Sequence, residues 1–94
     1  MTAMNKEPVM LCDVAPRDGF QVVPTWIPTE TKVRIIEGLA AAGMKRIEAG
    51  AFVSPKHVPQ MADTAEVHAT VRVPDGTALT TLVPNLRGAQ NALA

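Results

Sequence analysis

Short apolar or β-branched runs alternate with helical patterns along this chain. Three such runs, at 9–14, 46–49 and 78–83, are each bounded by Gly, Pro or charged residues and predict β-strands. A helical pattern follows each strand. This alternation predicts an α/β fold in which parallel strands are joined by right-handed crossovers. The first strand, being almost wholly apolar, is expected to be buried.

The clearest helix lies between the first two strands. Its ends are marked by Thr29, a suitable N-cap residue, and by Gly43, a suitable C-cap glycine. Between them an apolar stripe recurs at helical spacing and predicts the buried face. The stripe consists of Val33, Ile36, Leu39 and Ala40.

A second helix is predicted over 63–71. Asp63 and Glu66 have the spacing of a capping box at its start, and Val67 and Val71 lie on one face. A third helix is predicted to begin near Arg87.

The spacing of the strands suggests a larger architecture. They recur about every 30 to 40 residues, close to the repeat of a (β/α)8 TIM barrel. Residues 1–94 are therefore expected to form the N-terminal portion of such a barrel, about three βα units, although a compact three-stranded α/β sandwich is an alternative. The long segments at 15–28 and 50–62 would be loops at the catalytic face. The exposed strand edges of a partial barrel call for the remainder of the barrel or another chain, as in a homo-oligomer, to cover them.

Composition narrows the range of functions. The chain has 94 residues, 47% of them apolar, and a formal net charge of zero, so we expect a packed core and no nucleic-acid partner. Aromatic residues make up 3%, too few for a base-stacking surface. No apolar run approaches the roughly 20 residues that span a bilayer, so no membrane partner is expected. A single cysteine and an N-terminus (1–7) without a secretory pattern favour the cytoplasm.

Adjacent charges follow the first strand and are the first candidates for chemistry. Asp18 offers a hard oxygen ligand suited to Mg²⁺ or Mn²⁺. Arg17 presents a fixed fork of donors that could stabilise a carbonyl oxygen as it becomes an enolate. The alternative is a surface pair in an ordinary turn before Gly19.

Glu48 favours the chemical interpretation. It lies within an apolar strand, where an unpaired carboxylate would be costly to bury, so a cationic partner is expected. Arg17, at the end of the neighbouring strand, is the natural candidate. If the strand turns its other face inward, Glu48 is simply solvated. We predict that Cys12 is a small core residue and that His57 and His68 are structural or solvated.

Several segments resemble the N-terminal third of the 3-hydroxy-3-methylglutaryl-CoA lyase family, in order and at the family's spacing. The segment containing Phe-Val-Ser-Pro-Lys is the most specific, since Arg-Asp-Gly alone would indicate only the wider superfamily of metal-dependent aldolase-like barrels, synthases included. The segments are DVAPRDGFQ (13–21), IPTETK (27–32), IE (47–48), AFVSPK (51–56), VPQMAD (58–63) and VPNLRG (83–88).

The resemblance implies a function and a role for four residues. It implies cleavage of an acyl-CoA substrate, 3-hydroxy-3-methylglutaryl-CoA, into acetyl-CoA and acetoacetate with a divalent metal (Mg or Mn). Asp18 would bind the metal, Arg17 would steady the thioester enolate, Glu48 would support Arg17, and Gln21 would lie close to the substrate. The family's remaining metal ligands, a His-x-His pair and an asparagine, are not found in these 94 residues, so we expect this chain alone to be inactive.

Two departures from the family pattern leave the acyl group open. Val22-Val23 stands where the family usually has Asn-Glu, and Ala51 stands where it usually has serine. A related lyase acting on another 3-hydroxyacyl-CoA is therefore an alternative. A non-catalytic α/β module that works through association is another.

Overall fold

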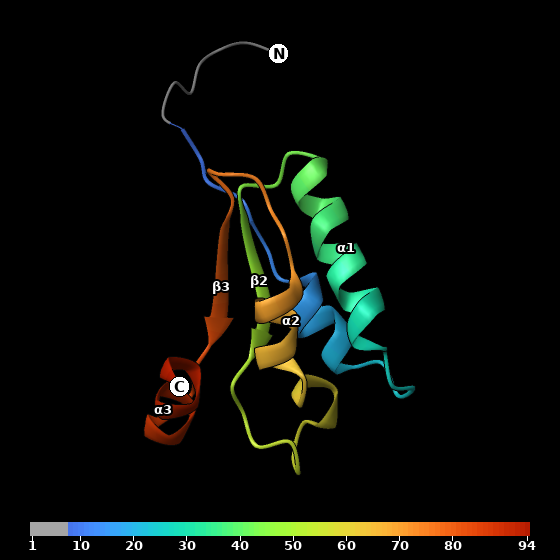
Figure 1. Ribbon diagram of the computed structural model, residues 1–94, viewed down its shortest axis with the longest axis vertical. Helices are drawn as coiled ribbons and strands as arrows, with labels where there is room; N and C mark the ends of the chain where they lie inside the picture. The colour runs from blue at the N-terminus through green and yellow to red at the C-terminus, as the bar shows by residue number, and fades with distance from the viewer. Residues whose placement is uncertain (1–7) are drawn as a thin grey trace.

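An open parallel β-sheet with helices beside it forms the part of the chain that the computed structural model describes, residues 8–94 (Figure 1). The strand order is β1-β2-β3, and both neighbouring pairs are parallel. The predicted α/β fold with parallel strands is therefore confirmed. The strands are β1 (Cys12–Asp13), β2 (Arg46–Ala51) and β3 (Ala78–Leu82).

The first strand is shorter and more exposed than predicted. Only two residues of β1 pair with β2, and the preceding Val9, Met10 and Leu11 are exposed. Cys12 is also exposed, so the expectation of a core cysteine was wrong. The physical reason is position, because β1 is the edge strand of the sheet and pairs on one side only. An apolar run predicts burial only where a neighbouring element exists to cover it.

The helices agree with the predicted order but include two short additional turns. Gly43, with φ of 104°, follows the first long helix, as a C-terminal glycine should. The third helix begins one residue before Arg87, and the Asn85 side chain caps it by accepting a hydrogen bond from the Gly88 amide at 2.8 Å. The helical elements are η1 (Ala15–Gly19), α1 (Thr29–Ala41), η2 (Pro59–Met61), α2 (Thr64–Thr70) and α3 (Leu86–Leu93).

One predicted N-cap was wrong, and the other, Asp63, occupies the N-cap of α2 without making the capping bond. Pro28, not Thr29, occupies the N-cap of α1, and the Thr29 hydroxyl instead donates to the Asp63 carboxylate at 2.6 Å. Asp63 precedes α2 but makes no side-chain capping bond, because its carboxylate binds Thr29 and Lys32. Tertiary contacts of the Asp63 carboxylate, a hydrogen bond with Thr29 and an ion pair with Lys32, have replaced both local capping bonds.

The main core lies between one face of β2 and the two helices α1 and α2. Ile47 is fully buried and Ala49 is nearly so, and both pack against the predicted stripe of α1, against Val67 of α2 and against Val71, which follows α2. Because successive strand residues alternate between faces, Glu48 points to the opposite side of the sheet. The strand pattern thus directs one carboxylate to the face that α1 and α2 do not cover.

A smaller apolar cluster sits near the carboxyl end of β2. Phe20, Ala51 and Met61 are its buried members, so it joins the segment after η1 to the segment after β2. Among residues 8–94, no helix has the length and apolarity to cross a bilayer. Residues 1–7, which we used as a sign of cytoplasmic location, lie outside the described residues.

Candidate active site

A single turn of π-helix, η1, presents the two charged residues that follow β1. The amide of Asp18 donates to the carbonyl of Val14 at 2.7 Å, and Pro16 is the buried residue of the turn. We had predicted a loop over 15–28, and its first part is helical instead. π-Helical turns are rare and occur often at functional sites. This one places Arg17 and Asp18 beside the carboxyl end of the sheet.

Arg17 and Glu48 form an ion pair across the first two βα units. The Arg17 Nε donates to Glu48 Oε1 at 2.5 Å, and the two side chains are 23% and 18% exposed. This confirms the pairing that the burial of Glu48 predicted. A partly buried, charge-assisted hydrogen bond of this kind fixes the direction of the guanidinium.

Asp18 lies beside the pair and remains open to solvent. Its Oδ1 is 3.4 Å from Arg17 Nη1, and its side chain is 65% exposed. A carboxylate held there has oxygen lone pairs available to a hard cation. Within residues 8–94 no group of three or more His, Cys, Asp and Glu side chains could hold a metal ion. Among the described residues Asp18 is therefore a single candidate ligand, without a complete metal-binding set around it.

Gln21 is not drawn into the ion pair. Its side chain is exposed and lines a cavity of about 280 Å³ between the 21–26 segment and Pro59-Gln60. Trp26 lies in the same wall. No hydrogen bond in the described chain joins Gln21 to Arg17 or Glu48, so its substrate contact stays a prediction.

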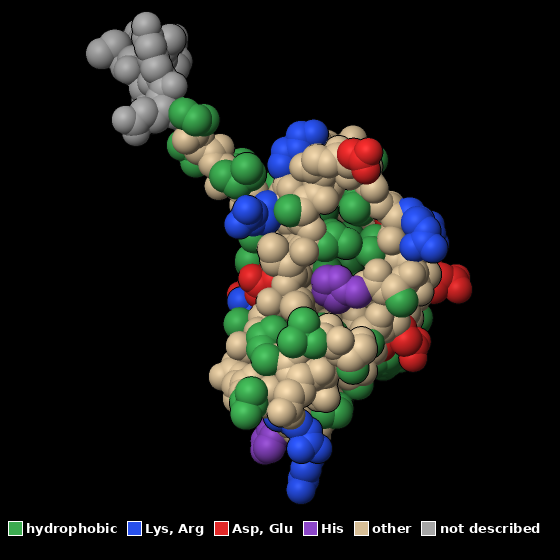
Figure 2. Space-filling model, turned by 60° about the vertical axis from the view of Figure 1, so that its left-hand side comes forward, with side chains coloured by type: hydrophobic (Ala, Val, Ile, Leu, Met, Phe, Trp, Pro, Cys, Tyr) green, Lys and Arg blue, Asp and Glu red, His purple; other side chains and the backbone are tan. Residues whose placement is uncertain are grey.

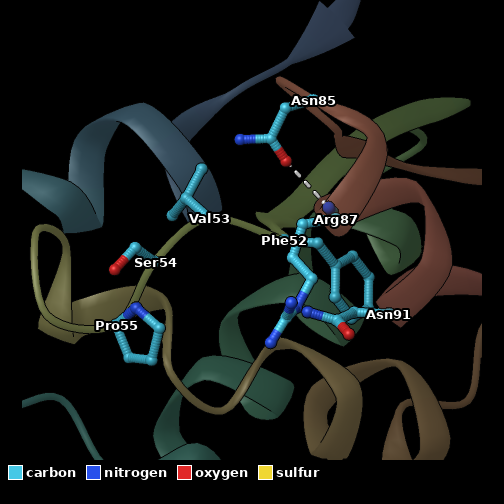
Figure 3. Close-up of a pocket in the computed structure, with 8 residues that line it drawn as sticks. Phe52, Val53, Ser54, Pro55, Asn85, Arg87 and Asn91 are labelled. Atoms are coloured by element: carbon cyan, nitrogen blue, oxygen red, sulfur yellow. Dashed lines mark hydrogen bonds between the residues drawn. The ribbon is translucent and has the colours of Figure 1, made fainter.

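A second cavity, of about 300 Å³, lies at the carboxyl ends of β2 and β3 (Figure 3). Sequence reasoning had not identified it as a site. The available signal was position, since Arg87 follows the end of β3 much as Arg17 follows the end of β1, and parallel strands present these ends at one edge. Its lining residues are Phe52, Val53, Ser54, Pro55, Asn85, Arg87, Gly88 and Asn91.

The two histidines have no metal-binding arrangement. His57 is exposed in the segment after β2. His68 stacks on Phe52 with 6.3 Å between ring centroids, and its Nε2 is buried without a hydrogen-bond partner among the described residues. Desolvation by burial lowers the pKa of His68 below its ordinary value of 6.5. The structural role predicted for His68 agrees with this packing.

Comparison with known proteins identifies relatives over almost all of the described chain. A family model described as HMGL-like matches residues 8–93. The 3-hydroxy-3-isohexenylglutaryl-CoA/hydroxymethylglutaryl-CoA lyase of Pseudomonas aeruginosa is 48% identical over 85 residues, which are 90% of this chain and 28% of that protein. The mitochondrial hydroxymethylglutaryl-CoA lyase of Gallus gallus is 45% identical over 86 residues, 92% of this chain and 29% of that protein.

Solved structures agree in shape. The hydroxymethylglutaryl-CoA lyase of Pseudomonas aeruginosa superposes with a TM-score of 0.86 at 48% identity and covers 90% of this chain and 28% of its own. An HMG-CoA lyase from Acinetobacter baumannii, in complex with coenzyme A and 3-methylmalate, gives 0.85 at 43% identity, covering 89% and 28%. These neighbours are TIM barrels, so the three βα units are the N-terminal portion of that fold, as predicted. The chain spans a little over a quarter of the length of these relatives.

Proposed function

Because this chain belongs to the HMGL-like family, we propose that it contributes part of the active site of a carbon–carbon lyase acting on a 3-hydroxyacyl-CoA. 3-Hydroxy-3-methylglutaryl-CoA is the first candidate substrate, with acetyl-CoA and acetoacetate as products. The observation that carries the proposal is the Arg17–Glu48 ion pair, with Asp18 beside it, at the carboxyl end of the sheet. Active sites of TIM barrels lie at this end.

The reaction defines what the ion pair would do. A general base takes the proton of the C3 hydroxyl, the O–H electron pair forms the carbonyl of acetoacetate, and the pair of the C2–C3 bond moves into the thioester as an enolate. That enolate then takes a proton at C2 to give acetyl-CoA. Arg17 would stabilise the negative charge that develops on the thioester oxygen. Glu48 would keep the guanidinium aimed at that oxygen by holding its Nε, while Nη1 lies 3.4 Å from Asp18 Oδ1.

The donor chemistry of Asp18 fits one position of a divalent-metal site. Its carboxylate is a hard oxygen ligand, 65% exposed, and Mg²⁺ and Mn²⁺ prefer such ligands. When bound, a divalent cation would acidify the tertiary hydroxyl and orient the bond to be cleaved. Asp18 would supply one ligand to the cation, next to Arg17, and the other ligands would come from outside the described residues.

The cavity of about 300 Å³ is our candidate for part of the CoA moiety. It lies at the same end of the sheet as the ion pair and combines the Phe52 ring with the Arg87 cation and two asparagine amides. Such a mixture of apolar surface and a few polar groups suits a pantetheine chain and its phosphates. The Acinetobacter baumannii relative binds coenzyme A, which supports a thioester substrate for this chain.

A longer acyl group is a second candidate. The Pseudomonas aeruginosa relative is named for a 3-hydroxy-3-isohexenylglutaryl substrate as well as for hydroxymethylglutaryl-CoA. Ala51 is buried at the carboxyl end of β2 and packs with Phe20 and Met61, so its methyl group, where the family usually has serine, makes this end of the strand more apolar. A more apolar acyl site would favour such a branched substrate.

Association with the rest of a barrel is part of the proposal. Exposed apolar side chains lie just before and after β1 and across β3 and α3, and Figure 2 shows hydrophobic side chains gathered on the lower part of one face. On the β3 and α3 side they are Leu82, Val83, Leu86 and Leu93. In a complete barrel further βα units would cover the strand edges.

An exposed free Cys12 is compatible with the reducing cytoplasm, where we place the protein.

The test is a hybrid barrel in which residues 8–93 of this chain replace the matched part of the Pseudomonas aeruginosa lyase. With Mg²⁺ or Mn²⁺, the hybrid should cleave at least one thioester from a panel that includes 3-hydroxy-3-methylglutaryl-CoA and its isohexenyl analogue. The 94-residue chain alone should show no turnover. A hybrid that folds, by circular dichroism and gel filtration, but cleaves none of the panel would refute the proposal. If the chain alone then forms a stable oligomer, the association module is the better explanation.

A further inference from the structure

A buried lysine links three segments around the candidate site. Lys32 of α1 is 2% exposed, and its Nζ donates to Asp63 Oδ1 at 2.6 Å and to the Gln60 carbonyl at 2.5 Å. The ammonium also lies 4.0 Å from the centroid of the Trp26 ring. Thr29 supplies the second partner of Asp63. We call these five residues the Lys32 cluster.

The stability of the fold does not by itself explain this cluster. Lysine is almost never fully buried unless it is paired. Replacing a buried ion pair with apolar side chains of similar volume is often neutral or even stabilising, whereas removing one partner is strongly destabilising. A pair of Lys32 and Asp63 is therefore not needed to fill this space. Its geometry is the property that an apolar pair would not reproduce.

The cluster holds the backbone that follows the ion-pair turn. The Gln60 amide nitrogen donates to the carbonyls of Val23 and Thr25 at 2.9 and 2.7 Å, and its oxygen accepts from the Ile27 amide at 3.0 Å. Gln60 is itself 6% exposed, so these bonds are shielded from water. Because Lys32 binds the Gln60 backbone, it fixes the residue whose side chain clamps the 23–27 segment.

A continuous series of hydrogen bonds then reaches Arg17. The Val23 amide donates to the Phe20 carbonyl at 3.0 Å, and the Phe20 amide donates to the carbonyls of Ala15 and Arg17. The Phe20 ring is buried against the segment after β2. The stretch that runs from Arg17 through Gln21 is thus tied at its far end to Gln60.

We propose that Lys32 and Asp63 are positioning residues for the lyase reaction, which fix the 20–28 segment so that Arg17 and Gln21 stay in register with Glu48. The inference rests on the proposed function for its kinetic part. Active-site groups need supporting residues that lock them within about 0.5 Å. A misplacement of about 1 Å can lower turnover by about 100-fold.

The kinetic experiment separates positioning from stability in the hybrid barrel. Lys32→Met and Asp63→Leu should each lower the urea midpoint, because each leaves one buried charge unpaired. The double variant Lys32→Met/Asp63→Leu should recover most of that midpoint but keep a kcat reduced by about 100-fold. Val67→Ala, in the core between α1, α2 and β2, is the matched control, because it should lower stability without lowering kcat of the folded protein.

Hydrogen exchange of the same proteins gives a readout that does not depend on activity. The Ile27 and Val23 amides are bonded in the structure and should exchange about tenfold faster in the double variant, but not in the Val67→Ala control. If the unsubstituted hybrid shows no turnover, the proposed function fails, and exchange alone still decides whether the pair anchors the segment. A stable double variant with unchanged exchange, or with changed exchange but unchanged kcat, would overturn the positioning role.

Discussion

The contact between Arg17 and Glu48 allows a quantitative prediction. Glu48→Gln keeps the size of the side chain and an oxygen that can accept from Arg17 Nε, but it removes the negative charge. Without that charge the guanidinium keeps, among residues 8–94, only the Asp18 carboxylate, 3.4 Å from Nη1, as an anionic partner. We therefore expect the Arg17 side chain to turn away from Glu48, on the sheet face that α1 and α2 do not cover, toward Asp18 and solvent.

The structure sets the size of this effect. A hydrogen bond to a charged group contributes about 1.5–3 kcal/mol. The side chains are 23% and 18% exposed, so solvent screens part of the interaction and about 1.5–2 kcal/mol is appropriate here. If that energy acts in the transition state, kcat/KM should fall about 10- to 30-fold.

A double-mutant cycle in the hybrid barrel measures the coupling. Arg17→Gln alone should lower kcat/KM by about 100-fold or more, because it removes the donor to the enolate oxygen. Glu48→Gln should then have little additional effect in the Arg17→Gln background. Glu30→Gln, the same substitution at an exposed position in the first turn of α1, is the control and should leave kcat/KM unchanged.

Additivity would refute the assigned role. If Glu48→Gln lowers kcat/KM equally in both backgrounds, within about 0.5 kcal/mol, then Glu48 does not act through Arg17. Urea denaturation of the same four proteins shows whether a loss of folded protein accounts for any change.

Three further predictions concern the metal, the pH dependence and the fit of α3. Asp18→Ala should weaken Mn²⁺ binding to the hybrid barrel about tenfold or more in calorimetry, with little change in stability because the side chain is exposed, and unchanged affinity would exclude it as a ligand. Burial lowers the pKa of His68 in the folded protein, so the unfolded chain binds the proton more readily than the folded one. The contribution of neutral His68 to the free energy of unfolding is therefore complete above about pH 6.5 and is lost as the pH falls through the folded pKa. The urea midpoint should therefore fall less between pH 7.5 and 5 in His68→Gln than in the unsubstituted protein, whereas His57→Gln should make no such difference. An equal fall of the midpoint in the two variants would contradict the assignment of this pH dependence to His68. Gly88→Ala would place Cβ 2.5 Å from the backbone carbonyl of Phe52, just past β2, and should lower the free energy of unfolding by about 1–3 kcal/mol in urea denaturation. Gly38→Ala is the control, because nothing lies within 4 Å of its new Cβ, and it should not destabilise the protein. Equal urea midpoints for the two variants would show that α3 can shift to relieve the close contact.

Much of the fold could be predicted from periodicity. The stripe of α1, the apolar residues of β2 and the β-branched run of β3 predicted elements within a few residues of their bounds, because side-chain period and residue type are local properties of each segment. The pairing of Arg17 with Glu48 was also predictable, since a carboxylate in an apolar strand requires a partner.

Local patterns failed where another part of the chain competed for the same group. Thr29 and Asp63 have good capping chemistry, yet their side chains bind each other, and Lys32 also binds Asp63. Lys32 appeared in the sequence as an ordinary polar helix residue, because nothing near it in sequence reveals its partners at 60 and 63. The π-helical geometry of η1 was likewise not predictable from turn residues alone.

The sequence by itself determined the alternation of strands and helices and the residue types available for chemistry, because these depend on side-chain period and on the cost of burying charge near each residue. Only the tertiary structure decided that β1 is an exposed edge, that Lys32 is buried against Gln60 and Asp63, and that residues after β2 and β3 enclose a cavity. These features depend on contacts between residues about 30 or more positions apart, and no local pattern specifies which distant segment will supply the partner.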